Sequence, residues 1–407
     1  MMTKMKEKLI QSLLPWMGVL LAALVSACGS DEPTLSADER DEGDLVLFGA
    51  GTDGSASTRA VSIPMPVGGR FACKMYYQAG VDANSYDAHS LAWLQVEGSA
   101  GNALYRQASF AEPTDKDGYG FDRLSSIFYW QNRKEHTYVA LADFNKLTTD
   151  DGTNEGSLLH PSILEKEYRA ATESSPEEKL YITFNLSTAG KSSCAEQPDP
   201  IRAITTKQPK SYTPEANRVS LYFKHCFSQV QVNLARSQDS SVEDLQPENI
   251  VSVELMGVTA EGRVTPWIYA DGTYEEPSYK AVVAKDFTTA EWSASEGYGT
   301  HFEMFPASTT TTGYIKSYNA IAFGMLRAIR IVWKEPVNNG NGGTTYIEHK
   351  VTRAIETDYQ NLRSGTRHIF NIQIRRGVLA VITASILPWE VDPTEYHTDG
   401  SVTTKNS

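Results

Sequence analysis

Short segments rich in β-branched and aromatic residues, separated by polar turns, recur along most of this chain. In segment 368–374, Phe370, Ile372 and Ile374 alternate with polar residues. A two-residue period of this kind is typical of a strand in an antiparallel sheet with one buried face. Further segments of β type lie at 71–78, 126–131, 137–144, 179–187, 219–223, 250–258, 264–269, 328–333, 345–351 and 378–387. Many short strands joined by polar turns predict an all-β fold built from sandwiches.

The length of the chain, 407 residues, constrains the number of domains. Once an N-terminal signal peptide is set aside, about 380 residues remain, which suits two domains of ordinary size. The polar run 205–217 is the expected joint between them. We therefore expect one β-sandwich over residues 44–212 and a second over residues 213–407, which ends in a polar tail.

The first 27 residues have the composition of a secretory signal peptide. Lys4, Lys6 and Lys8 precede the apolar run 9–28, which contains small residues near its end. The uninterrupted apolar part is shorter than the ~18 residues of a membrane-spanning helix. We expect residues 1–27 to be removed on export.

The end of that run, from Val25 to Cys28, resembles a bacterial lipobox. This resemblance implies cleavage before Cys28 and attachment of lipid to its thiol. Several acyl chains would give stable attachment to the outer membrane, whereas a single chain anchors only marginally. Residues 29–32 (GSDE) open an acidic linker over 28–43 and look like a surface-export tag, although a solvated linker has the same composition.

Composition and cysteine content exclude several other classes of protein. The net charge is −13 and basic residues do not cluster, so nucleic acid is not an expected partner. Beyond Cys28, the widely spaced Cys73, Cys194 and Cys226 form neither a disulfide framework nor a metal motif. We expect buried thiols, or one bridge at most, and no metal or cofactor.

Sequence motifs of common enzymes are missing. The sequence has no GxSxG, no HExxH and no Gly-rich phosphate loop, and its eight histidines are scattered. A pair of carboxylates for glycoside hydrolysis stays open, because their separation is spatial. We expect a protein that is not an enzyme.

The first predicted strand, 44–51, is followed by a segment with nothing to pack. Leu45, Val46, Leu47 and Phe48 are apolar on both faces, as in a strand buried on two sides. Gly, Ser, Thr and Asp then fill most of the tether up to Arg59 and Ala60. A protease specific for basic residues could cut there and separate the strand from the rest of the chain.

The segment 219–234 changes its alternation halfway. Apolar residues occupy odd positions in 219–223 but even positions in 230–234. Since a one-residue slip turns every side chain over, a bulge or a helical turn is expected near His225. Without a nearby carboxylate or histidine in the sequence, His225 is expected to be structural.

Together these features resemble the fimbrillin family, the type V pilins and related surface lipoproteins of Gram-negative anaerobes. The resemblance rests on the lipobox and on segments 58–61 (TRAV), 221–234, 302–309 (FEMFPAST) and 382–390 (ITASILPWE). It implies two tandem transthyretin-like antiparallel β-sandwiches. It also implies lipoprotein export, trimming by an Arg-specific protease between Arg59 and Ala60, and polymerisation by donor-strand exchange, in which a neighbour's strand replaces the lost one.

The strand best suited for donation lies in 378–389. Its aliphatic residues are expected on one face: Val378, Ala380, Ile382, Ala384 and Ile386. Such a strand adds to a sheet through backbone hydrogen bonds, and its alternate side chains fill pockets. Burial contributes roughly 1.5–3 kcal/mol for each large aliphatic side chain, before the cost of ordering the strand.

The resemblance leaves the role within a fimbria open. A stalk subunit, a tip or accessory subunit and an anchor share the fold, and the expected partners are other pilin subunits and a host protein or glycan receptor. A non-polymerising glycan- or host-binding surface lipoprotein is the alternative. In that case Trp93, Trp130 and Trp292 could stack on sugar rings, although aromatic residues more often form the core.

Overall fold

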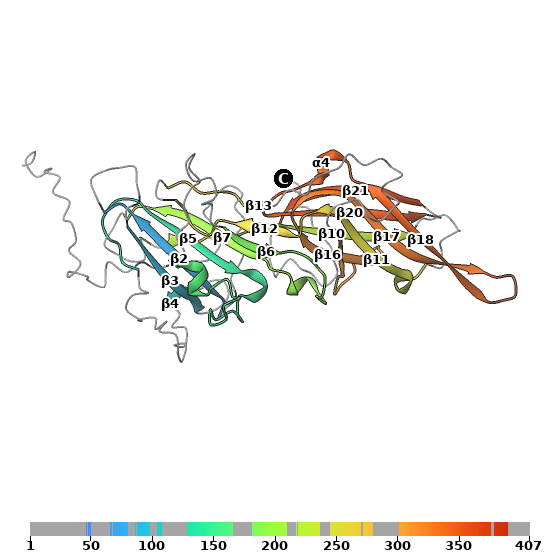
Figure 1. Ribbon diagram of the computed structural model, residues 1–407, viewed down its shortest axis with the longest axis horizontal. Helices are drawn as coiled ribbons and strands as arrows, with labels where there is room; N and C mark the ends of the chain where they lie inside the picture. The colour runs from blue at the N-terminus through green and yellow to red at the C-terminus, as the bar shows by residue number, and fades with distance from the viewer. Residues whose placement is uncertain are drawn as a thin grey trace, which may run out of the picture.

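Strands make up most of the described chain and form two β units that lie end to end along its long axis (Figure 1). The computed structural model describes residues 46, 48–49, 66, 68–79, 86, 88–97, 104–107, 128–165, 181–209, 217, 219–236, 245–269, 272–279, 301–375 and 378–389. Within these ranges no helix has the length and apolar character needed to cross a membrane. The prediction of an all-β fold is confirmed.

The first unit is one eight-stranded sheet with the order β8-β1-β4-β3-β2-β5-β7-β9. Its strands are β1 (Phe48–Gly49), β2 (Arg70–Tyr77), β3 (Ala88–Glu97), β4 (Leu104–Gln107), β5 (His136–Asp143), β7 (Pro200–Lys207), β8 (Val219–Ser220) and β9 (Lys224–His225). β8 and β9 are nearly consecutive in the chain but lie at opposite ends of this order. The sheet therefore curls until its ends meet, and Thr205 Oγ1 of β7 donates to the carbonyl of Ser220 in β8 at 2.8 Å.

The curled sheet explains why β5 is buried along its whole length. Tyr138 and Ala140 point into the core of the first unit, while Val139 and Leu141 belong to a second core that continues into the other unit. A strand covered on both faces loses the polar alternation of a half-exposed strand and reads as a continuous apolar run.

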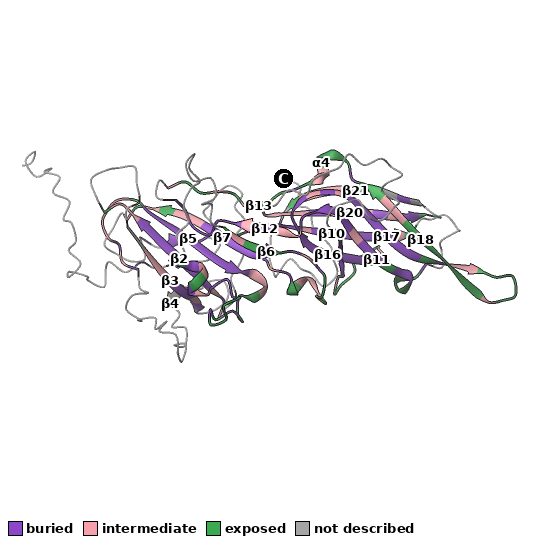
Figure 2. Cartoon of the chain, in the orientation of Figure 1, coloured by how far each residue is buried: buried purple, intermediate pink, exposed green. Residues whose placement is uncertain are grey.

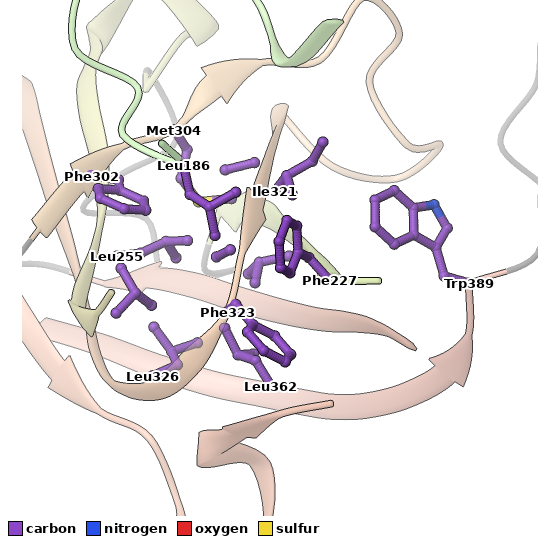
Figure 3. Packing of buried hydrophobic residues seen from close by; sticks show 14 of the residues in the cluster. Leu186, Phe227, Leu255, Phe302, Met304, Ile321, Phe323, Leu326, Leu362 and Trp389 are labelled. Carbon is purple, nitrogen blue, oxygen red and sulfur yellow. The ribbon is translucent and has the colours of Figure 1, made fainter. Parts of the chain in front are cut away.

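The second unit is a sandwich of two sheets with the orders β15-β16-β10-β20-β21 and β14-β11-β17-β18, and β19 pairs with β17. These strands are β10 (Ser228–Arg236), β11 (Ile250–Val258), β14 (His301–Glu303), β15 (Phe305–Pro306), β16 (Lys316–Ala322), β17 (Gly324–Asn338), β18 (Thr344–Ala354), β19 (Asn361–Leu362), β20 (Thr366–Arg375) and β21 (Val378–Pro388). Inward residues of both sheets share one core, which Figures 2 and 3 show as buried. The helices are short: α2 (Pro161–Leu164), α4 (Thr357–Gln360), η2 (Phe144–Lys146), η3 (Cys194–Glu196) and η5 (Pro247–Asn249).

A third small sheet connects the two units. β6 (Ile182–Asn185) pairs with β12 (Glu261–Val264), which pairs with β13 (Ser278–Tyr279). Nearby, Gln197 is fully buried and exchanges hydrogen bonds with the backbone of Ile321 in β16, at 2.8 and 2.9 Å. The units are thus joined by strand pairing and by a shared core.

The chain leaves the first unit later than position 212, because β8 and β9 still belong to the first sheet. Val219, Leu221 and Phe223 pack in the core of the first unit, whereas Val230 and Val232 pack in the core of the second. The expectation of a bulge or a helical turn near His225 was wrong. The alternation changes because the chain passes there from one sheet to another.

Gly262 lies where β12 meets the core. A Cβ atom on this residue would lie 2.5 and 2.6 Å from two ring carbons of Phe227, too close for a buried ring to accommodate without moving. We expect Gly262→Ala to lower the free energy of unfolding by about 1–3 kcal/mol through overpacking. Urea denaturation measures the loss, and Ser278→Ala, on the exposed side of neighbouring β13, should stay within about 0.5 kcal/mol of the parent protein. Equal stabilities of the two variants would contradict this packing.

His136 in β5 is fully buried and is held as a neutral ring. Its Nδ1 donates to the carbonyl of Lys134 at 2.9 Å, and its Nε2 accepts from the backbone N–H of Gln131 at 3.2 Å. Burial lowers the pKa of His136 to about 4. Because the unfolded chain then binds more protons, the contribution of His136 to stability is present above about pH 6.5 and is lost as the pH falls through 4.

We therefore expect NMR titration to show the His136 ring neutral down to about pH 4, and stability to fall between pH 6.5 and 4. In His136→Phe this part of the pH dependence should disappear. A ring that titrates near pH 6.5 would contradict the assignment.

Candidate assembly site: the first and last strands

The first strand is inserted in the sheet of the first unit. In β1, Phe48 pairs antiparallel with Tyr105 of β4 and parallel with Val219 of β8. Just before the strand, the N–H of Val46 donates to the carbonyl of Phe128 at 2.9 Å. β1 therefore has a neighbour on each side, and its removal would expose two unpaired strand edges.

Side chains of the first strand also complete the core of the first unit. Phe48 is 2% exposed and Val46 is 6% exposed. The Phe48 ring meets Tyr138 edge-on at 5.4 Å between ring centroids and Phe128 at 5.9 Å. Withdrawal of β1 would open an apolar slot with Phe128, Tyr138 and Val219 in its walls.

The described part of the predicted first strand, 44–51, is Val46 and β1. Leu45 and Leu47 lie outside the described residues. The same holds for the lipidation residue Cys28 and for the cleavage pair Arg59 and Ala60, so these remain predictions.

β21, the predicted donor strand, lies at the edge of its sheet and pairs antiparallel with β20. The pairing shifts by one residue next to Asn371, and Ile382 is the extra residue of this bulge. Ala384 and Ile386 pair with the inward-facing Phe370 and His368, whereas Val378 and Ala380 pair with Arg375 and Gln373. The strict alternation expected through Val378, Ala380, Ile382, Ala384 and Ile386 is therefore broken.

Sequence reasoning missed Leu379 near the start of this strand, which is buried at 2% exposure. Toward the other end Ala384 and Ile386 are half-buried, and Leu387 is 39% exposed. The sequence around the bulge carries no glycine or proline that would have marked it. β21 is thus a strand of its own subunit's sheet. Two of its side chains, Ala384 and Ile386, are only half-buried there.

Trp389 follows β21 and reaches the first unit. Its indole stacks on the imidazole of His225 in β9, with ring centroids 3.7 Å apart and planes 6° from parallel. His225 Nδ1 lies 2.7 Å from Asp199 Oδ1, and both side chains are buried. Figure 3 shows Trp389 at the end of its strand, beside the buried cluster that contains Phe227 and Ile321.

His225 is held in place as the sequence suggested, but the carboxylate beside it was missed. Asp199 lies 26 positions earlier in the chain, at the start of β7, and strand pairing brings it to His225. A second carboxylate, Asp143 at the end of β5, accepts from the Asp199 N–H at 3.1 Å. Burial, and then the charge of Asp199, raise the pKa of Asp143 to about 6.

Other candidate residues take core positions. Trp93 and Trp130 are each 5% exposed, so neither presents a face to a sugar ring, and Trp292 lies outside the described residues. Cys73 and Cys226 are buried free thiols, and Cys194 is a half-buried one. Among the residues with a described position, no three His, Cys, Asp or Glu side chains gather as metal ligands would.

Comparison with known proteins gives one match to a family and several distant structural likenesses. A family model described as fimbrillin-like matches residues 173–389, which is more than half of the chain. No curated protein matches the sequence.

Three of the distant likenesses to solved structures illustrate their range. A candidate cell adhesion protein of Bacteroides uniformis is 12% identical, with a TM-score of 0.44 over 85% of this chain and 99% of its own. One from Bacteroides ovatus is 14% identical, with a TM-score of 0.43 over 86% and 97%. The tip fimbrial protein Mfa3 of Porphyromonas gingivalis is 10% identical, with a TM-score of 0.36 over 85% and 99%.

The family match does not depend on these likenesses. It covers β6, every strand of the second unit and Trp389, and it ends where the described chain ends. It supports a role in surface fimbriae. The chain belongs to the fimbrillin-like family.

Proposed function

We propose that this protein is a subunit of a surface fimbria, as a stalk or a tip or accessory component, and that it assembles by donor-strand exchange. A protease cuts after Arg59, the first strand leaves, and a strand from a neighbouring subunit takes its place. The observation that carries this proposal is the position of β1 between β4 and β8, with Phe48 buried in the core.

The covalent tether of β1 determines whether this strand stays in its slot. Among the described residues of this strand, Phe48 and Gly49 pair with β4 on one side and with β8 on the other. While it is covalently attached it returns to its slot, because the tether keeps its local concentration high. After a cut it becomes a separate peptide that dilutes away, and a strand from a neighbouring subunit can replace it.

β21 is the proposed replacement, supplied by the next copy. It is eleven residues long, and it carries buried Leu379 and half-buried Ile386 for pockets in the slot. A donated strand gains about 0.5–1.5 kcal/mol net for each ladder hydrogen bond. β21 must first break its pairing with β20. The extent of exchange therefore depends on how stable β21 is in the sheet of its own subunit.

We also propose that the chain reaches the outer membrane as a lipoprotein through Cys28. Growth of an expressing strain with labelled palmitate should label the protein, and Cys28→Ser should prevent the labelling. Labelled Cys28→Ser protein would show that lipid is attached elsewhere or not through the lipobox.

An Arg-specific digestion tests the assembly proposal. We expect cleavage to give a new N-terminus at Ala60 and ladders that resist SDS at room temperature, whereas Arg59→Ala remains monomeric under the same digestion. Arg70→Ala is the matched control, because Arg70 lies at the start of β2, inside the folded unit. Ladders from Arg59→Ala, or none from the cleaved parent, would contradict the proposal.

A further inference from the structure

We propose that the stack of Trp389 on His225 is a latch on β21, and that segment 219–225 links this latch to β1. The latch would hold the last strand in its own subunit until the first strand has left. This inference rests on the proposed function, in which β21 is the donated strand.

The latch lies at the end from which β21 opens. β20 ends at Arg375 and β21 begins at Val378, so the two strands form a hairpin that holds the Val378 end covalently. As an edge strand, β21 has β20 as its described neighbour in the sheet. It therefore separates by peeling from Pro388 and Trp389 toward the hairpin turn.

Trp389 is fixed by its backbone and by its ring. Its N–H donates to the carbonyl of Gly365 at 2.8 Å, and its indole is 8% exposed. Gly365 in turn donates its N–H to the carbonyl of Phe227 at 2.9 Å, and Ser364 Oγ donates to the carbonyl of His225 at 3.0 Å. The end of β21 is thereby tied to residues 225–227, where the chain crosses between the units.

The His225 ring depends on few contacts. Asp199 is hydrogen-bonded to Nδ1, and Trp389 stacks on one face of the ring. The Phe144 ring meets it in an edge-on arrangement, with 5.2 Å between the two ring centroids. Nε2 is buried and makes no hydrogen bond to any described residue. A small displacement of the His225 backbone would therefore separate the two stacked rings.

The same short segment forms one wall of the β1 slot. β8, residues 219–220, pairs with β1, and β9 with His225 follows after only three residues. At the end of the sheet, β8 has β1 as its described strand neighbour. Loss of β1 removes the strand pairing of β8 and frees residues 219–223, while β9 keeps its pairing with β7. The shift of residues 219–223 would then move the His225 side of the stack, so that the slot and the donor strand become available together. A contiguous covalent segment is a physical route for such coupling.

Hydrogen–deuterium exchange on the uncut monomer tests the latch. We expect Trp389→Ala and His225→Ala each to speed amide exchange in β21 at least tenfold, and the double variant to add little, because both remove one stack. Trp389→Leu keeps an apolar side chain but removes the ring that stacks on His225. It should also speed amide exchange in β21 if the stack itself, and not apolar burial alone, holds the strand. Leu387→Ala, which removes an exposed side chain from the same strand end, should leave it unchanged.

The link to β1 has its own readout. Cleavage at Arg59 followed by removal of the first strand should speed exchange in 219–225 and in β21 of the parent protein. Unchanged β21 exchange in Trp389→Ala and Trp389→Leu would overturn the latch, and unchanged β21 exchange after loss of β1 would overturn the link. If the variants loosen β21 and yet cleaved protein forms no polymer, the latch stands and the donor role of β21 fails.

Discussion

A disulfide between positions 49 and 104 will stop polymerisation even after complete cleavage at Arg59. Gly49 of β1 and Leu104 of β4 are directly opposed in an antiparallel pair. Opposed residues of such a pair have Cα atoms about 4.5–5.5 Å apart, which a disulfide spans. Gly49→Cys with Leu104→Cys therefore ties the first strand to its neighbour, and the cut peptide cannot leave the slot.

The disulfide can be reduced, and the reduced double variant is the control. Oxidised double-cysteine protein should give no ladders after digestion, and a reductant added to the same sample should restore them to the level of the parent protein. The single variant Gly49→Cys should polymerise with or without reductant. Ladders from the oxidised, fully cleaved double variant would mean that subunits join without using the β1 slot.

Replacement of Phe48 by alanine will destabilise the first unit by about 3–5 kcal/mol, as is usual for a buried Phe. Phe48 is 2% exposed and meets the rings of Phe128 and Tyr138 within the core. The loss combines missing apolar burial with a cavity that its neighbours cannot close. Urea denaturation monitored by the unfolding transition of the first unit measures it.

An exposed aromatic residue serves as the comparison for Phe48. Tyr346 lies in β18, on the hairpin that extends past the second unit in Figure 1, and is 56% exposed. Tyr346→Ala should change stability by no more than about 0.5 kcal/mol. A loss below about 1 kcal/mol for Phe48→Ala would mean that β1 contributes little to the core. A replacement strand in the slot would then stabilise the first unit only slightly.

Local alternation predicted many of the strands, although none of the expected segments covers β3, β7 or β16. The segment 250–258 corresponds to β11, and 368–374 lies within β20. The strand expected at 264–269 instead covers 261–264, because Pro266 lacks the N–H that a ladder needs. Trp267 and Ile268 are buried there without belonging to a strand.

Non-local features could not be predicted in this way. β10 and β20 pair in parallel although more than a hundred residues separate them, and no local pattern fixes such a register. The group formed by Asp199, His225 and Trp389 combines residues next to or within β7, β9 and β21, which belong to two units. By contrast, the apolar run from Leu45 to Phe48 predicted a buried strand, and Val46 and Phe48, which share one face, are both buried.

Assembly by donor-strand exchange depends most directly on the fate of the first strand after cleavage. Mass spectrometry of purified polymer, formed from protein cut at Arg59, measures whether the peptide that ends at Arg59 is still present. If donor strands are exchanged, subunits within the polymer have lost this peptide, and hydrogen exchange finds a protected β21 in a neighbouring subunit's slot. Polymer in which every subunit retains the peptide beside β4 and β8 would contradict donor-strand exchange.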